Sequence, residues 1–107
     1  MKKIGVVGLG LNNPYFYAPL LKELGAQVST VWDYTEENAR AYAEQFGCEV
    51  VPRVEDYPDV DGVLIDSRNS DHIPLARPFM ARGIPVYIEK PLSHSVEEAK
   101  NFLKECE

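Results

Sequence analysis

Two glycines near the start of the chain have the spacing of a phosphate-binding turn. Gly8 and Gly10 close a short apolar run, and Asn13 stands where a third glycine commonly completes this fingerprint. Glycines at these places let the backbone turn tightly and approach a pyrophosphate, whose charge is favoured by the N-terminus of the following helix. A plain strand-to-helix turn has the same pattern, so the glycines alone leave both interpretations open.

An acid follows at the place where a nucleotide-binding unit needs one. Asp33 ends the second apolar run, 25 positions after Gly8. A carboxylate there can accept both hydroxyls of an adenosine ribose and repels a 2′-phosphate, which favours NAD over NADP. The alternative is a solvated acid beside a helix that starts at Thr35.

Two later segments also carry groups suited to chemistry. The loop 67–72 combines hydroxyl, guanidinium, amide and imidazole groups, although it also suits a polar turn in which Ser70 or Asp71 caps a helix. Lys90, in Glu89-Lys90-Pro91, can polarise a hydroxyl or assist proton transfer beside a nicotinamide. Pro91 restricts the lysine to an extended backbone. A surface lysine before a rigid turn has the same sequence pattern, so both interpretations stay open.

The elements that must position these groups alternate along the chain. Apolar runs predict strands over 4–7, 27–32, 49–51, 60–65 and 86–89, and residues 54–57 suit a single helical turn. Helices are expected to begin near Asn13, Thr35, Ser70 or Asp71, and Ser95. Their predicted apolar faces are Tyr17, Leu20, Leu21 and Leu24; Ala39, Tyr42, Ala43 and Phe46; Ile73, Ala76, Phe79 and Met80; and Val96, Ala99, Phe102 and Leu103.

Strict alternation of strands and helices predicts an α/β fold. Parallel strands joined by right-handed crossovers give a three-layer, Rossmann-like, doubly wound sheet of about five strands. Ligands of such sheets bind beyond the carboxyl ends of the strands, where the glycines, Asp33, loop 67–72 and Lys90 all fall. No linker interrupts residues 1–107, which we interpret as one dinucleotide-binding domain without a second domain.

Composition excludes several classes of partner. The formal net charge of -6 opposes a nucleic-acid backbone, and no apolar run approaches the length that spans a membrane. Cys48 and Cys106 lack metal-ligand spacing, so no metal site is expected. We therefore expect a cytoplasmic protein with no nucleic-acid or membrane partner.

Together these landmarks give a family resemblance. The chain resembles the N-terminal NAD(P)-binding Rossmann domain of the Gfo/Idh/MocA oxidoreductases, the glucose-fructose oxidoreductase and inositol dehydrogenase family. The matching segments are Ile4-Gly5-Val6-Val7-Gly8-Leu9-Gly10, Asp33, Ala43 with Phe46-Gly47, Asp61-Gly62-Val63-Leu64-Ile65, Asn69 with His72, Gly83, and Glu89-Lys90-Pro91.

The resemblance implies a dehydrogenase that transfers hydride between a nicotinamide cofactor and a sugar- or cyclitol-type hydroxyl. It implies that the turn residues Gly8, Gly10, Leu11, Asn12 and Asn13 approach the pyrophosphate and that Asp33 approaches the adenosine ribose. It further implies that Ser67, Arg68, Asn69 and His72 line the cofactor toward the nicotinamide, that Glu89 lies near the nicotinamide ribose, and that Lys90 is the catalytic lysine.

Three departures support an alternative from another class. Asn13 replaces the third glycine, Asp66 adds a carboxylate beside an anionic cofactor unless Arg68 pairs with it, and the family's C-terminal substrate domain is absent. The chain alone is therefore not expected to catalyse. The alternative is a stand-alone Rossmann-like interaction or regulatory module that has lost cofactor binding.

The expected strand order also predicts a contact surface. In the order 3-2-1-4-5, the strand containing Val86-Tyr87-Ile88 is an exposed edge. An unpaired apolar edge invites pairing with another chain, so we expect a homo-oligomer or a partner chain there.

Overall fold

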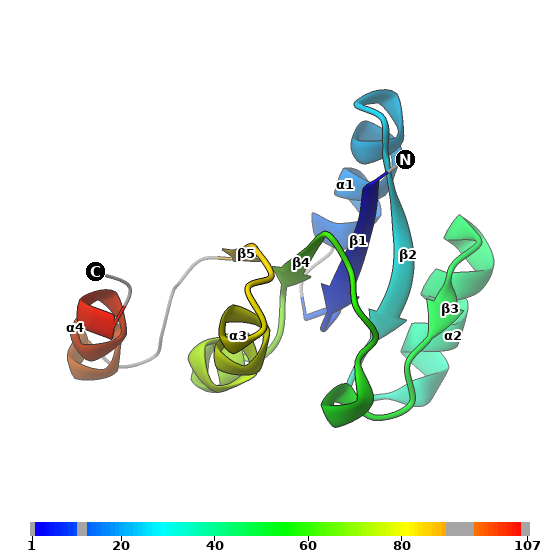
Figure 1. Ribbon diagram of the computed structural model, residues 1–107. Helices are drawn as coiled ribbons and strands as arrows, with labels where there is room; N and C mark the ends of the chain where they lie inside the picture. The colour runs from blue at the N-terminus through cyan, green and yellow to red at the C-terminus, as the bar shows by residue number, and fades with distance from the viewer. Residues whose placement is uncertain (1, 11–12, 90–95, 106–107) are drawn as a thin grey trace.

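A parallel sheet forms the centre of the molecule. The computed structural model describes residues 2–10, 13–89 and 96–105. Within them the sheet has the order β3-β2-β1-β4-β5 (Figure 1). Its strands are β1 (Lys2–Val7), β2 (Ala26–Trp32), β3 (Glu49–Val50), β4 (Gly62–Ile65) and β5 (Val86–Ile88). The predicted α/β class and strand order are confirmed, although β3, β4 and β5 are each shorter than predicted.

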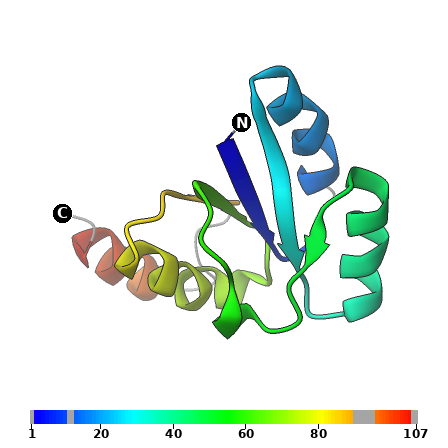
Figure 2. The ribbon, with the colours of Figure 1, turned by 45° about the vertical axis from the view of Figure 1, so that its right-hand side comes forward.

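The helices cover both faces of this sheet. They are α1 (Asn13–Glu23), α2 (Glu36–Phe46), α3 (His72–Ala81) and α4 (Val96–Glu105), with single 3-10 turns at Val54–Asp56 and Asn69–Asp71. Figure 2 shows α1 and α2 on one side of the strands and α3 on the other. Val6 packs in the cluster under α1 and α2, and Val7 packs in the cluster under α3. Successive side chains of a strand point to opposite faces, which explains the continuous apolar run.

The predicted apolar face of α1 is correct for Leu21 but wrong for Leu20 and Leu24. Leu20 is 53% exposed and Leu24 is 82% exposed, whereas Pro14 and Ala18 are buried and Leu21 is packed partly against the core. Positions 14, 18 and 21 form a helical stripe of their own. The small side chain of Ala18 lets α1 lie close to the sheet, so the larger leucines of the neighbouring stripe face outward.

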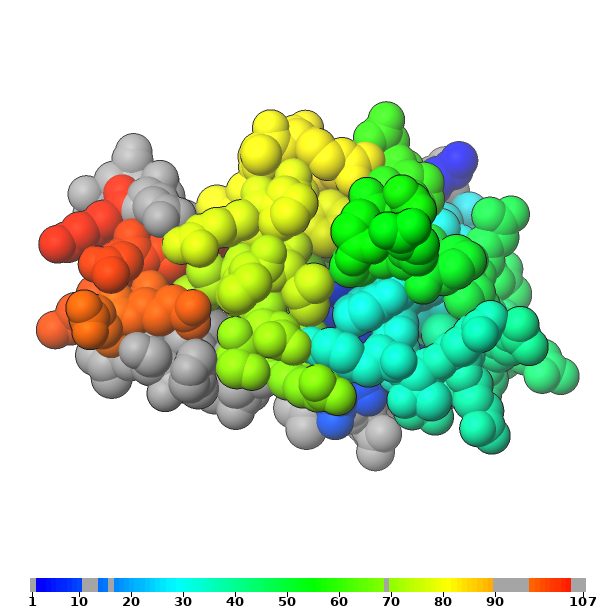
Figure 3. All heavy atoms as spheres, turned by 90° about the horizontal axis from the view of Figure 1, so that it is seen from below, coloured from blue at the N-terminus to red at the C-terminus, as the bar shows by residue number. Residues whose placement is uncertain are grey.

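The faces of α2, α3 and α4 are mostly confirmed. Ala39, Tyr42 and Ala43 of α2 are buried, as are Ile73, Ala76 and Phe79 of α3. Phe102 of α4 is buried too, but Met80 and Leu103, which were predicted to belong to these faces, are exposed. Helix α4 lies at the end of the molecule past β5, beside α3 in the view of Figure 3. The capping residue predicted for it, Ser95, lies outside the described residues.

A tyrosine inserted into the sheet was not predicted. The hydroxyl of Tyr57 accepts a hydrogen bond from Thr30 Oγ1 (2.9 Å) and donates one to the carbonyl of Val6 (3.0 Å). Its ring lies over Gly5, where any Cβ would come within 2.6 Å of the hydroxyl. The register of β1 against β2 shifts at the same place, between Ile4 and Gly5. Gly5 therefore serves packing and does not belong to the phosphate turn.

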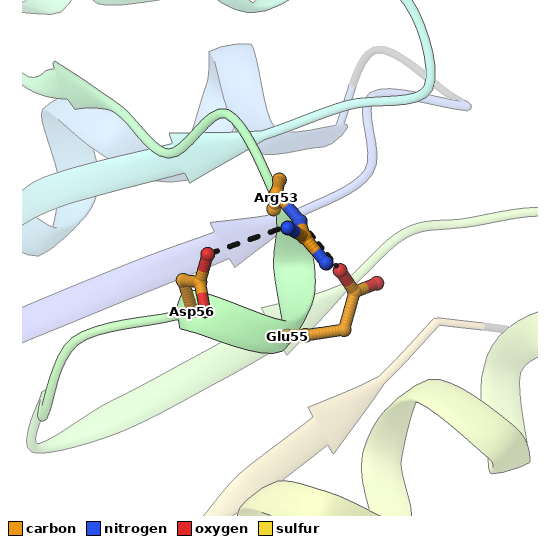
Figure 4. Close-up of polar contacts among 3 residues, drawn as sticks. All are labelled: Arg53, Glu55 and Asp56. Atoms are coloured by element: carbon orange, nitrogen blue, oxygen red, sulfur yellow. Dashed lines mark hydrogen bonds and ion pairs between the residues drawn. The ribbon is translucent and has the colours of Figure 1, made fainter.

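The predicted turn at residues 54–57 is present as the 3-10 turn Val54–Asp56. Figure 4 shows Arg53 beside this turn with Glu55 and Asp56. The Arg53 Nε lies 3.2 Å from a Glu55 oxygen and 3.9 Å from an Asp56 oxygen. All three side chains are well exposed, so these ion pairs stabilise the fold little.

Candidate functional site

The loops that follow β1 and β4 touch at the carboxyl edge of the sheet. Gly8 has a φ of 94°, which L side chains rarely adopt, and a Cβ there would lie 2.7 Å from the Cα of Ser67. At Gly10 a Cβ would lie 2.9 Å from the carbonyl oxygen of Asp66. Both glycines are thus required by the close approach of two backbones. This approach brings the two loops together at the carboxyl edge, where doubly wound sheets have their ligand crevice.

Backbone hydrogen bonds hold the glycine loop in this position. The Gly8 N–H donates to the carbonyl of Trp32 (2.7 Å), and the Gly10 N–H donates to the carbonyl of Asp66 (2.8 Å). The loop is therefore tied to the ends of both β2 and β4, the strands on either side of β1. The N-terminus of α1 then presents its first N–H groups and its positive dipole to any phosphate in the crevice.

Asp33 is oriented by two backbone donors. Its Oδ1 accepts from the N–H of Leu9 (2.8 Å) and its Oδ2 accepts from the N–H of Thr35 (3.1 Å). Thr35 lies at the N-cap position of α2, where the helix was expected to begin, but its side chain makes no capping hydrogen bond. A carboxylate can accept about four hydrogen bonds, so Asp33 keeps capacity for a ligand.

Three side chains near Asp33 form a cluster that joins the β2 and β4 loops. The guanidinium of Arg68 lies 4.1 Å from the centre of the Tyr34 ring. The Tyr34 hydroxyl donates to Asp71 Oδ2 and accepts a long bond (3.4 Å) from the N–H of Arg68. Burial and the bond to Asp71 raise the pKa of Tyr34, so this hydroxyl remains a donor at neutral pH. The cluster bridges the crevice beside Asp33.

The remaining predicted residues of the β4 loop are largely internal. Asp66 and Ser67 are buried. His72 is only 1% exposed, and its Nε2 lies 2.9 Å from the carbonyl oxygen of Ser67. The imidazole thus supports the backbone of the loop from within. Asn69 is the first residue of the 3-10 turn before α3.

Glu89 lies at the end of the carboxyl edge formed by β5. This residue follows β5, is 9% exposed, and donates its N–H to the carbonyl of Ile65 (3.0 Å). The hydroxyl of Tyr17, on α1, lies 3.3 Å from Glu89 Oε2. The end of β5 is therefore connected both to β4 and to the helix that follows the glycine loop.

The structure brings most of the predicted site residues to one edge. Gly8, Gly10, Asp33, Ser67, Arg68 and Glu89 lie at the carboxyl ends of β1, β2, β4 and β5, with Asn13 at the start of α1. Leu11, Asn12 and Lys90 lie outside the described residues. Sequence reasoning missed Tyr17 and Tyr34 as members of the site. Tyr34 had a signal, since it directly follows Asp33, whereas the contact of Tyr17 spans 72 positions and has no local signal.

Other kinds of site find little support in the described part of the chain. No group of three metal-ligating side chains occurs among residues 2–10, 13–89 and 96–105. In the same ranges, no helix is both long and apolar enough to cross a membrane. A hollow of about 670 Å³ opens at the opposite, amino edge of the sheet, where Lys3, Ser29 and Cys48 are among its lining residues. Burial raises the pKa of the Cys48 thiol to about 11, which keeps it protonated and unreactive.

Comparisons with known proteins agree with this geometry. Residues 2–107 match the sequence profile of GFO_IDH_MocA, described as an oxidoreductase family with an NAD-binding Rossmann fold. Inositol 2-dehydrogenase 4 of Saccharopolyspora erythraea is 35% identical over 96 residues, which are 85% of this chain and 28% of that protein.

Solved structures show the same fold. The UDP-N-acetylglucosamine 3-dehydrogenase of Acidithiobacillus ferrooxidans is 30% identical with a TM-score of 0.82, over 96% of this chain and 33% of that one. The WlbA dehydrogenase of Bordetella pertussis, solved with NADH, is 20% identical with a TM-score of 0.85, over 97% of this chain and 33% of that one. The chain thus spans about a third of the length of these relatives.

Proposed function

This chain belongs to the GFO_IDH_MocA oxidoreductase family, whose members share an NAD-binding Rossmann fold, and from that premise we propose that it binds NAD in preference to NADP. It is the dinucleotide-binding domain of such an oxidoreductase. The site is the crevice beyond the carboxyl ends of β1, β2, β4 and β5. A crevice at this place, where the strand order reverses direction, is where open α/β sheets take nucleotides.

The observation that carries the preference is the orientation of Asp33. Two backbone N–H groups fix its carboxylate at the end of β2. A fixed carboxylate accepts the 2′- and 3′-hydroxyls of the adenosine ribose without an ordering cost, and its charge repels the 2′-phosphate of NADP. Arg68 stands nearby, but its guanidinium is engaged by the ring of Tyr34.

The other residues of the crevice receive roles from their positions. Gly8 and Gly10 let the backbone of the turn approach the pyrophosphate, and Leu11, Asn12 and Asn13, which follow in the sequence, are proposed to contact it as well. His72 holds the Ser67 carbonyl and so shapes the loop against which the cofactor lies. Glu89 is assigned to the nicotinamide side of the cofactor. Asn69 and Arg68, in the loop after β4, are assigned to the outer edge of the site.

For the whole protein we propose oxidation of a sugar- or cyclitol-type hydroxyl to a carbonyl, or the reverse reduction. Bound NAD would accept the hydride from the carbon that carries the hydroxyl, and NADH would donate it in the reverse direction, while a proton leaves or joins the oxygen. Lys90 is the proposed catalytic lysine, because it directly follows Glu89 in the sequence and a lysine can polarise a hydroxyl or assist proton transfer. This chain holds the cofactor and a lysine but spans only a third of its relatives, so catalysis is assigned to the longer protein.

A titration of the purified chain with NADH and with NADPH tests the proposal. Cofactor fluorescence and calorimetry report binding. Saturable binding with NADH preferred by about tenfold or more, the worth of one charged contact, is the expected result. Equal affinities contradict the role of Asp33. Failure of both cofactors up to millimolar concentration contradicts cofactor binding and favours the interaction module as the function.

A contact through the edge of the sheet is a second proposal. β5 stands at the end of the strand order, and Tyr87 in its middle is 52% exposed. An edge strand offers unpaired backbone donors and acceptors that another strand can complete. We propose that a second copy of the chain, or a partner chain, pairs along Val86–Ile88.

A further inference from the structure

A tyrosine on α1 contacts the residue that follows β5. The Tyr17 hydroxyl lies 3.3 Å from Glu89 Oε2, and the Tyr17 ring meets the Tyr87 ring edge to face, with centroids 6.2 Å apart. The contact joins the helix after the glycine turn to the segment after the last strand of the sheet. Among the described side chains of α1, only Tyr17 is hydrogen-bonded to Glu89.

The order of the strands assigns this contact to one half of the cofactor site. β2 and β5 lie on opposite sides of β1 in the sheet. A dinucleotide whose adenosine half reaches Asp33, at the end of β2, extends its other half past β1 toward β4 and β5. Glu89 directly follows β5 and is tied to β4 through the Ile65 carbonyl. The carboxylate that Tyr17 contacts therefore belongs to the nicotinamide side.

The chemistry of the pair suits a fixed acceptor. A carboxylate that is 9% exposed loses much of its hydration and needs donors within the protein. Tyr17 supplies one. Hydrogen bonding with Tyr87, burial and the charge of Glu89 raise the pKa of Tyr17 to about 12, so the phenol keeps its proton at neutral pH. Because the aromatic side chain of Tyr17 is rigid, its hydrogen bond fixes the orientation of the Glu89 carboxylate. The remaining lone pairs of that carboxylate then point in fixed directions.

We propose that Tyr17 is a positioning residue for the nicotinamide half of the site, holding Glu89 where its carboxylate accepts the hydroxyls of the nicotinamide ribose. The inference rests on the proposed function, because it assumes that the cofactor lies in this crevice. It adds a residue whose effect is specific to one half of the cofactor. That selectivity is what a purely structural role would lack.

The test compares two probes on the Tyr17→Phe chain. NADH carries both nucleosides, whereas ADP carries only the adenosine and the pyrophosphate. Tyr17→Phe keeps the ring against Tyr87 and removes only the hydroxyl. We expect NADH to bind about fivefold more weakly, the size of one typical hydrogen bond, and ADP to bind as in the wild-type chain. Thermal unfolding checks that the variant remains folded.

Two further variants make the result specific. Tyr15→Phe is the matched control on the same helix, because the Tyr15 ring packs against Tyr42 and Phe46 in the core and is expected to leave both affinities unchanged. Glu89→Gln should weaken NADH selectively. The Tyr17→Phe/Glu89→Gln double variant should lose no more than Glu89→Gln alone, since Tyr17 acts through Glu89.

The outcomes separate the two proposals. A wild-type chain that binds neither NADH nor ADP overturns the proposed function and this inference with it. Where the wild-type chain binds both probes, any of three results overturns the inference alone. Tyr17→Phe keeps its full affinity for NADH, or it loses affinity for NADH and ADP equally, or its loss adds to that of Glu89→Gln in the double variant.

Discussion

At the scale of single residues, the proposed site depends on a carboxylate, Asp33, that backbone donors hold in place. Asp33 was identifiable from the sequence because the end of the second strand is a position with a definite chemical task. Its donor Leu9 was not, since a hydrogen bond between a loop and an acid 24 positions away leaves no pattern in the sequence. The burial of His72 was equally hidden, because an imidazole after a polar loop suits a ligand contact as well as a core.

Asp33→Asn tests the charge at this position. Asparagine keeps the shape and one oxygen acceptor but removes the negative charge. NADH should bind about tenfold more weakly and NADPH should lose its disadvantage, because the repulsion of the 2′-phosphate is gone. Calorimetric titration with both cofactors measures the change. Asp56→Asn, in the exposed ion pair with Arg53, should change neither affinity. An unaltered ratio of the two affinities in Asp33→Asn is incompatible with its role.

At the scale of elements, the crevice exists because two loops touch backbone to backbone. The alternation of strands and helices could be predicted from apolar runs and helix boundaries, since local patterns fix them. The faces of α1 could not, because Leu20 and Leu24 match the helical period as well as Pro14, Ala18 and Leu21 do. The choice between the two stripes depends on how closely α1 approaches the sheet, which is a tertiary property. The place of Tyr57 within the sheet depends likewise on a register shift between β1 and β2.

Gly8→Ala measures how strongly the two loops depend on their close approach. The new Cβ meets backbone atoms of Asp66 and Ser67 within 2.8 Å, and the φ of 94° is unfavourable for alanine. We expect a loss of about 3 kcal/mol in the free energy of unfolding, from backbone strain and overpacking together, with loss of NADH binding.

Gly83→Ala is the control for backbone strain alone. Gly83 has a φ of 74°, but a Cβ there would meet nothing within 4 Å. This variant should lose only about 1 kcal/mol and bind NADH normally. Urea denaturation compares the two variants. Equal losses would show that the approach of the two loops contributes nothing to stability.

At the scale of the whole molecule, the chain is elongated and its sheet ends at β5, which pairs only with β4 among the described strands. The principal extents are 38, 27 and 25 Å, and β5 lies toward one end with α4 past it (Figure 1). The order of strands could be predicted because alternation and right-handed crossovers allow few arrangements. The position of α4 could not, since its amphipathic pattern specifies a buried face and not the neighbour that buries it.

Tyr87→Lys tests the edge as an association surface. If two chains pair along β5, the sedimentation coefficient of the wild-type chain rises with protein concentration. A lysine on the edge strand should prevent this, because its charge opposes the pairing of strands. Leu24→Lys places the same charge at an exposed site just after α1 and should leave the association unchanged. A wild-type chain that stays monomeric at every concentration contradicts the proposed pairing.

Stability against alkali is a second property of the whole fold. The pKa of Tyr17 is raised to about 12, and burial raises the pKa of Tyr42 and Tyr57 above the ordinary value for tyrosine. Because the folded state then holds these protons more tightly than the unfolded state, the stability they provide is complete below about pH 10 and falls as the pH rises further. Urea denaturation at increasing pH should show this decline, with a shallower slope for Tyr57→Phe. A stability independent of pH above 10 would contradict the burial of these phenols.

The central claim is that a dinucleotide occupies the crevice at the carboxyl edge of the sheet. Nuclear magnetic resonance of the isotope-labelled chain, titrated with NADH, tests it most directly because it reports every backbone amide at once. We predict that the amides of Gly8, Gly10, Asp33, Ser67 and Glu89 shift together and saturate at one affinity. Shifts confined to the hollow at the amino edge, at residues such as Lys3, Ser29 and Cys48, or no shifts at all, would contradict the assignment of this crevice as the cofactor site.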